Sequence, residues 1–213
     1  MKRLVLLILL ILALAPGLGR PAPAEGPLET LRLRVDEFLE IMNDPQYGPD
    51  SRKAVQRERM WAVIKRTIFF EGVARLAVGK DWDRFSTEEK REFTDAFAEL
   101  LAASYLKVVQ EGYRDEKLAY LGQEFLAGDK AVVRTKVLRQ GLDVPVDVKM
   151  IKVKGSWLIY DAQVEGVSLV SNFRAQFNRI LLSRTPAQLI ELMKEKIGER
   201  RRAGGRKGGD SFL

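Results

Sequence analysis

The chain has 213 residues, of which 36 are Lys or Arg and 29 are Asp or Glu, and its formal net charge is +7 at pH 7. It contains no Cys and no His, which excludes disulfides, Cys–His and Ser–His–Asp catalysis, and zinc sites of the usual His/Cys kind. No GxxxxGK[ST] or GxGxxG loop occurs, so we expect no nucleotide, no cofactor, no metal and no enzymatic activity.

Residues 1–24 have the pattern of a secretory signal peptide. A positively charged start, Met1-Lys-Arg3, precedes an apolar run from Leu4 to Ala15, and Ala22-Pro-Ala24 offers a small-residue cleavage site. The run is shorter than the ~20 residues that a membrane-spanning helix needs, which favours a cleaved signal over a retained anchor. We expect cleavage near Ala24 and a soluble protein in the bacterial periplasm.

The rest of the chain predicts a single domain, 25–198, followed by a disordered basic tail, 199–213. The tail combines Arg200-Arg-Arg202 and Arg206-Lys207 with two Gly pairs. A basic surface attracts anionic partners, and in the periplasm these are membrane headgroups or acidic proteins and not nucleic acid.

The first half of the domain has helical periodicity. Apolar residues predict a helix over 28–42, a second helix from 50 or 51 to about 70, and a short third helix that ends at Gly79. The inner face of the second helix is expected to contain Val55, Met60 and Ile64, joined by Trp61 and Ile68.

A capping box predicts the start of a long helix after the loop 80–85. The Ser86 hydroxyl is expected to meet the amide of Glu89, whose carboxylate turns back to the cap. The helix continues to about Glu111 and carries one apolar stripe along its length: Phe93, Phe97, Leu100, Leu101, Ser104, Tyr105 and Val108.

From Lys117 the periodicity changes to that of strands, predicted over 118–125, 131–139, 144–153 and 157–164. Within the third strand the apolar side switches after Met150, which predicts either a β-bulge there or a strand end that is exposed to water on neither face. Four consecutive antiparallel strands form a meander with one face available for helices. The predicted class is therefore α+β, a four-stranded antiparallel sheet wrapped by N-terminal and C-terminal helices.

The strand at Trp157 leads through a corner at Glu165-Gly166 directly into a helix. Ser168 opens that helix, whose apolar positions include Val170, Phe173 and Phe177. Thr185-Pro186 then predicts the start of the last helix.

This corner carries a long motif. It has Trp157, Tyr160-Asp161 and the run Glu165-Gly-Val-Ser-Leu-Val170, followed by Phe173-Arg174 and Gln176-Phe177. The motif resembles that of the MlaC-like periplasmic phospholipid-binding proteins of the Mla lipid-transport (toluene-tolerance) family. Trp82 and the stripe of the long helix match that family too, so the resemblance covers about residues 69–192.

The resemblance implies a monomeric phospholipid carrier that catalyses nothing. It would shuttle lipid between an inner-membrane ABC transporter with its lipid-binding ring protein and an outer-membrane lipoprotein complex. The acyl tails would occupy an apolar cavity between the sheet and the helices. The residues expected to contact lipid are Phe70, Val73, Leu76, Phe97, Leu101, Tyr105, Val146, Val148, Met150, Trp157, Ile159, Val167, Leu169, Val170 and Phe173.

Three polar groups at the corner are expected to have structural roles. Glu165 and Arg174 are expected to form an ion pair that fixes the corner, with a partner contact as the alternative. Asp161 is expected to be a turn or edge carboxylate.

Three other functions remain open. The cargo could be a hopanoid-type polycyclic lipid in a broader, aromatic-lined pocket. The protein could instead be an adaptor with a filled core that docks on anionic membranes through its basic tail. A small cone-shaped α+β isomerase or dehydratase is disfavoured because such enzymes usually use a His.

Overall fold

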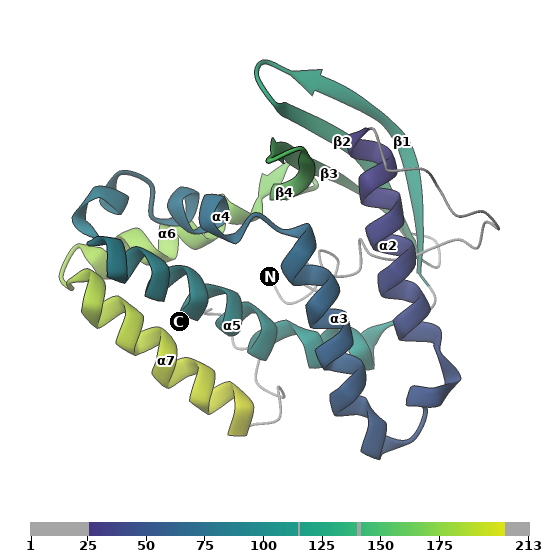
Figure 1. The fold of residues 1–213 in the computed structure, drawn as a ribbon, viewed down its shortest axis with the longest axis horizontal. Coiled ribbons are helices and arrows are strands. Elements are labelled where there is room, and N and C mark those ends of the chain that lie inside the picture. The colour runs from purple at the N-terminus through teal and green to yellow at the C-terminus, as the bar shows by residue number, and fades with distance from the viewer. Residues whose placement is uncertain (1–25, 115, 140–141, 203–213) are drawn as a thin grey trace.

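The computed structural model describes residues 26–114, 116–139 and 142–202 (Figure 1). The predicted signal peptide and most of the predicted tail lie outside these residues. The helices are α2 (Pro27–Asn43), α3 (Lys53–Thr67), α4 (Phe70–Val78), α5 (Thr87–Gly112), α6 (Leu169–Leu181) and α7 (Pro186–Arg202), with short 3-10 helices at Pro45–Tyr47, Asp50–Arg52 and Gly79–Arg84. The strands are β1 (Lys117–Leu126), β2 (Lys130–Arg139), β3 (Leu142–Val153), β4 (Ser156–Val164) and β5 (Val167–Ser168).

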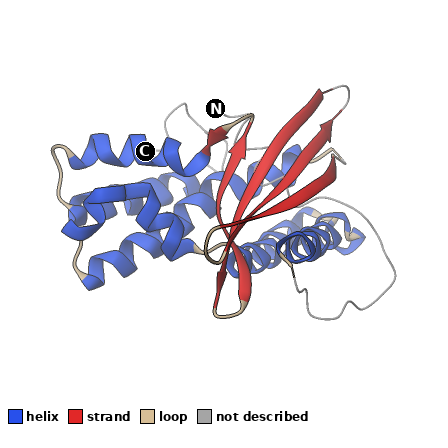
Figure 2. Cartoon of the chain, turned by 90° about the horizontal axis from the view of Figure 1, so that it is seen from above, coloured by secondary structure: helices blue, strands red, loops and turns tan. Residues whose placement is uncertain are grey.

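The strands form an antiparallel meander in the order β1-β2-β3-β4-β5, which Figure 2 shows in red as a twisted sheet beside the blue helices. The α+β class is confirmed, but the sheet has five strands and not the predicted four. Glu165 and Gly166 both have positive φ, +51° and +80°, as a two-residue hairpin turn of type I′ requires. The pattern break at this corner is therefore a tight hairpin, and Val167 pairs with Val164 in the added strand.

The bulge that was predicted in the third strand lies instead in β4, its partner strand, while the pairing of β3 with β2 is unbroken. Lys149 pairs with Asp161 and Met150 with Ile159, so Tyr160 of β4 is the extra, unpaired residue. A bulge turns the following residues to the opposite face of the sheet, and this places Tyr160 and Asp161 side by side at the sheet's border with the helices.

The second helix is shorter than predicted. It ends at Thr67, because Ile68 is extended and forms a parallel bridge with Ile159 of β4. The Phe69 amide donates to the Ile159 carbonyl at 2.8 Å, and α4 begins at Phe70. This short extended link joins the helices directly to the sheet.

The capping signals predicted for the long helix and the last helix are present, whereas the second helix begins at Lys53, after the predicted 50 or 51, without a side-chain cap. Ser86 and Glu89 form the complete capping box of α5. At α7 the Gln188 amide donates to the Thr185 hydroxyl. Helix α7 continues past Gly198, where the tail was predicted to begin, to Arg202. The extra turn is packed, since Arg200 is buried and Arg201 pairs with Glu99 of α5 at 2.9 Å.

The buried side chains form two separate cores. One joins the sheet to α2, α3 and the end of α5, and the other joins α4, α5, α6 and α7. Figure 1 shows the same division, with α4 to α7 grouped at one end and the sheet with α2 at the other. Within the described residues, no helix combines the length and apolar character needed to cross a membrane.

Candidate functional site

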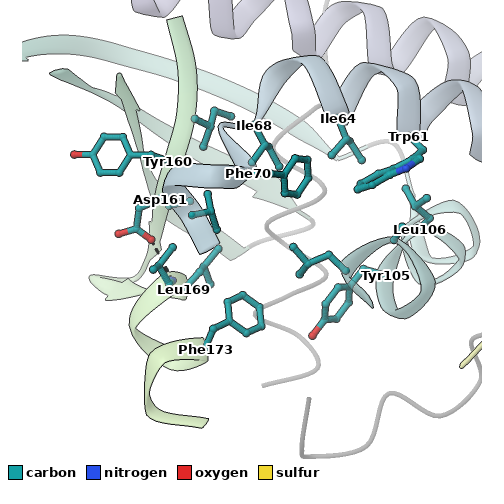
Figure 3. A pocket seen from close by; sticks show the side chains of 16 residues that line it. Trp61, Ile64, Ile68, Phe70, Tyr105, Leu106, Tyr160, Asp161, Leu169 and Phe173 are labelled. Atoms are coloured by element: carbon teal, nitrogen blue, oxygen red, sulfur yellow. Dashed lines mark hydrogen bonds between the residues drawn. The ribbon is translucent and has the colours of Figure 1, made fainter. Parts of the chain in front are cut away.

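An apolar cavity of about 120 Å³ lies at the seam between the two cores. Its walls come from α3, the Ile68 link, α4, α5, β4 and α6 (Figure 3). The lining residues are Trp61, Ile64, Ile68, Phe70, Val73, Leu101, Ala102, Tyr105, Leu106, Ile159, Tyr160, Asp161, Ala162, Leu169, Val170 and Phe173. Apart from the two hydroxyls, the indole N–H and one carboxylate, these side chains are hydrocarbon. The cavity is therefore suited to apolar groups.

Eight of the residues predicted to contact lipid lie together in this cavity. They come from the start of α4, the middle of α5, strand β4 and the start of α6: Phe70, Val73, Leu101, Tyr105, Ile159, Leu169, Val170 and Phe173. The structure therefore brings together residues spaced more than 100 positions apart in the chain.

The three predicted residues of β3 lie elsewhere. Val146, Val148 and Met150 are fully buried on the helix-facing side of the sheet, as their alternation indicated. That part of the sheet is covered by the first core, in which Val35 and Phe38 of α2 pack. The N-terminal helix fills the space that the prediction left for a ligand.

Four further predicted residues also lie outside the cavity. Phe97 is fully buried among aromatic rings of the second core, with the Phe173 centroid at 5.0 Å. Leu76 packs against that same core. Trp157 packs on Phe125 of β1, and Val167 is 47% exposed because β5 is the last strand of the sheet.

Asp161 organises one end of the cavity, although the sequence predicted only an edge carboxylate. It is 8% exposed and accepts hydrogen bonds from the Ser168 hydroxyl at 2.9 and 3.0 Å and from the Val170 amide at 3.2 Å. Lys149 of β3 lies 3.3 Å away and balances its charge. Ser168 in turn caps α6 by accepting from the Ser171 amide. A carboxylate at this helix start is also stabilised by the helix dipole.

Comparison with known proteins agrees with this architecture. The profile of the MlaC protein family matches residues 33–195. The chain belongs to the MlaC family. A solved structure similar to this MlaC-family chain is the phospholipid-binding protein from Ralstonia solanacearum in complex with a phospholipid, with 22% sequence identity and a TM-score of 0.69. The alignment covers 84% of this chain and 99% of that protein, and it shows a common fold. No curated protein matches the chain.

Sequence reasoning missed eight lining residues of this MlaC-family protein. Trp61, Ile64 and Ile68 had a usable signal, because their spacing places them along one side of a helix. That spacing placed them on the inner face of the second helix but did not indicate contact with a ligand. The others were Ala102 and Leu106 of α5 and Tyr160, Asp161 and Ala162 of β4. The three β4 residues are consecutive, and all three border one cavity because the bulge interrupts the alternation of the strand.

The two ends of the cavity differ in polarity. Tyr160 and Asp161 lie at one end, and Trp61 and Leu106 lie at the other, with Tyr105 nearby (Figure 3). Burial raises the pKa of Tyr105 to about 12, while the positive charge of Arg200 opposes part of that rise. Burial and the Asp161 charge also raise the pKa of Tyr160. Both phenols are therefore neutral at physiological pH.

The expected ion pair between Glu165 and Arg174 is absent from the described residues. Arg174 instead donates from Nε to the Leu76 carbonyl at 2.7 Å. This carbonyl lies in the last turn of α4, where a cation is favourable. Arg174 therefore joins α6 to α4. Glu165 occupies the hairpin turn, and its amide donates to the Pro145 carbonyl. No group of acidic, His or Cys side chains suited to a metal occurs in the described part of the chain.

Proposed function

We propose that this MlaC-family protein binds phospholipid by its acyl chains and carries it between membranes. The observation that carries the proposal is the apolar cavity at the seam between the two cores. Moving one methylene into water costs about 0.8 kcal/mol, so two long tails cost on the order of 20 kcal/mol. A carrier must therefore enclose the tails. The fold shared with the Ralstonia solanacearum protein, which was solved with a phospholipid, supports the same function.

The cavity must widen when it takes up a lipid. Its volume is about 120 Å³, and an engineered cavity of ~150 Å³ holds one benzene. Two acyl chains are several times larger. Because the cavity lies between two cores and not within one, we expect its walls to move apart with less loss of packing than widening a cavity inside a single core would cause. Helix α5, which contributes to both cores, would keep the two sides connected.

The proposed cellular location and partners follow from membership of the MlaC family and from the signal-peptide pattern in the sequence of residues 1–24. Residues 1–24 would direct export and be cleaved near Ala24. The mature protein would act in the periplasm as a monomer. It would exchange lipid with an inner-membrane ABC transporter that carries a lipid-binding ring protein, and with an outer-membrane lipoprotein complex. It would catalyse no reaction.

A polycyclic, hopanoid-type lipid is the second candidate cargo. Five aromatic side chains line the cavity, namely Trp61, Phe70, Tyr105, Tyr160 and Phe173. Flat rings pack well against aromatic faces, and a rigid ring system would require less widening than two flexible tails.

Native mass spectrometry of protein purified without detergent tests both cargoes, followed by lipid extraction from the same sample. A mass excess of one diacyl phospholipid per chain is the expected result. A polycyclic lipid would keep the carrier and change the cargo. A lipid-free mass that stays unchanged after incubation with liposomes would refute the carrier function and favour an adaptor with a filled core.

A further inference from the structure

A second, polar groove lies directly behind the apolar cavity. It has a volume of about 490 Å³ and is formed by α3, α5 and the last turns of α7. Trp61, Ala102 and Leu106 line both spaces. Only this layer of side chains therefore separates the hydrocarbon-lined cavity from the groove.

The charge of the groove is mainly positive. Arg57, Lys107, Arg200 and Arg201 line it, against the two carboxylates of Glu58 and Glu99. One carboxylate is neutralised locally, because Arg201 pairs with Glu99 at 2.9 Å. Lys107 also pairs, with Glu111 of the same helix at 3.5 Å. The lining as a whole has four cations against two carboxylates, so the groove favours an anion.

Two arginines of the groove are held in place. Arg57 donates to Gln110 Oε1 at 2.7 Å, and Gln110 is itself fixed by donating to the Lys53 carbonyl at 3.1 Å. Arg200 is 6% exposed, and its charge acts on the hydroxyl of Tyr105, which lines the apolar cavity. A guanidinium has five N–H donors, so Arg57 retains donors for a further acceptor. Arginines positioned in this way suit the oxygens of a phosphate.

We propose that this groove is the headgroup site, in which the phosphodiester of a bound phospholipid lies against Arg57 and Arg200 while its tails pass between Trp61 and Leu106 into the cavity. The inference rests on the proposed function. It adds a binding site for the lipid phosphate and an orientation for the bound lipid. It also gives Arg200, from the basic run at the end of α7, a role within the folded domain.

The opposite end of the cavity is less suited to a phosphate. Asp161 presents a carboxylate there, and the nearby Lys149 is already paired with it. The other nearby cation, Lys130, lies over the Tyr160 ring at 5.8 Å. The electrostatics of the two ends therefore orient the lipid with its phosphate toward α7.

The first test compares two lipids that have the same acyl chains, phosphatidylglycerol and diacylglycerol, on the wild-type protein and on R57Q. We expect R57Q to bind phosphatidylglycerol about tenfold more weakly, as loss of a charged hydrogen bond predicts, and to bind diacylglycerol as before. R59Q is the matched control, because Arg59 is exposed on the same helix and lies outside the groove. R200K, which keeps the charge, should lose less phosphatidylglycerol affinity than R200Q.

Three outcomes separate the proposals. Equal wild-type affinity for the two lipids, or equal losses in R57Q and R59Q, would overturn the headgroup site and leave the carrier function intact. Failure of the wild-type protein to bind either lipid would instead refute the carrier function. If inorganic phosphate alone raises the melting temperature of lipid-free wild-type protein but not of R57Q, as strongly as phosphatidylglycerol does, the groove is a site for free phosphate and the headgroup assignment is wrong.

The second test locates the headgroup directly. Because the chain has no Cys, a single fluorophore can be attached to A54C, at the rim of the groove, or to K130C, near Tyr160. After loading with a phospholipid that carries a nitroxide on its headgroup, verified by mass, we expect quenching at A54C and little at K130C. Quenching at K130C, or at neither position, would contradict the proposal.

Discussion

Val167 and Leu169 are two residues apart and similar in character, yet only one lies in the cavity. Leu169 lines it, whereas Val167 is 47% exposed on the last strand. We predict that L169E abolishes lipid binding, because an unpaired charge would face hydrocarbon. V167E is the matched control and should keep its lipid. Lipid extraction after purification measures both, with circular dichroism to check folding. Retained lipid in L169E would remove the start of α6 from the site.

Tyr105 should make stability depend on alkaline pH. Its folded-state pKa is raised to about 12, against an unfolded value of about 10. The unfolded state therefore loses its proton first, and the stabilisation that is complete below pH 10 is lost as the pH rises toward 12. We predict that Y105F reduces the loss of unfolding free energy between pH 8 and 11 by roughly 1 kcal/mol. Urea unfolding at the two pH values measures it, and an unchanged difference would contradict the assignment.

At the residue scale, local patterns predicted about half of the cavity. The positions on regular helices, such as Leu101 and Tyr105, followed from periodicity and resemblance. Asp161 and Tyr160 did not, because their placement depends on a bulge in β4 that arises from pairing with β3. Ile68 was likewise assigned to a helix that pairing with Ile159 ends.

At the scale of elements, Asp161 connects β4, β5 and α6 through the Ser168 hydroxyl and the Val170 amide. Replacing it with Asn removes the charge and leaves Lys149 without its counter-charge. We predict that D161N lowers the free energy of unfolding by about 1–3 kcal/mol, which corresponds to a melting temperature lower by several degrees. D143N is the control, since Asp143 is an exposed partner of Lys136. Equal melting temperatures for D161N and the wild type would show that the connection is not stabilising.

Helix starts were predicted well because their signals are local. The Ser86–Glu89 capping box and the Thr185 cap involve residues within three positions of each other. The fifth strand and the extended link at Ile68 were missed because both are defined by contacts with β4, which no local pattern reports.

At the scale of the whole molecule, the position of the cavity between two cores determines how lipid affects stability. Removing bound lipid should lower the melting temperature, since a ligand that binds only the folded state stabilises it. We predict faster amide exchange in the lipid-free protein at residues 64–73 and 168–173, which border the seam. The paired strands β2 and β3, which lie in the first core, should serve as the internal control. If amide exchange became faster by the same factor in all elements, the residues at the seam would not open independently of the rest of the fold.

The fold class and the meander order followed from the change of periodicity at Lys117, but the division into two cores did not. The sequence alone left open which helix covers the sheet. Once α2 occupies that face through Val35 and Phe38, residues such as Val146 and Val148 become packed interior, and the ligand space moves to the border of the sheet.

The walls of the cavity extend from Trp61 to Phe173 along the chain, and this determines when the cavity can form. A chain that emerges N-terminus first can complete its β-hairpins early, because their contacts are close in sequence. It cannot close the seam until α6 has emerged, and α5 waits longer for α7, which it meets through pairs such as Glu99–Arg201. During that interval the apolar faces of α3, α4 and α5 stay open to water. The nascent chain therefore exposes its future lipid site until α6 has emerged, and exposed apolar surface of this kind is what chaperones bind.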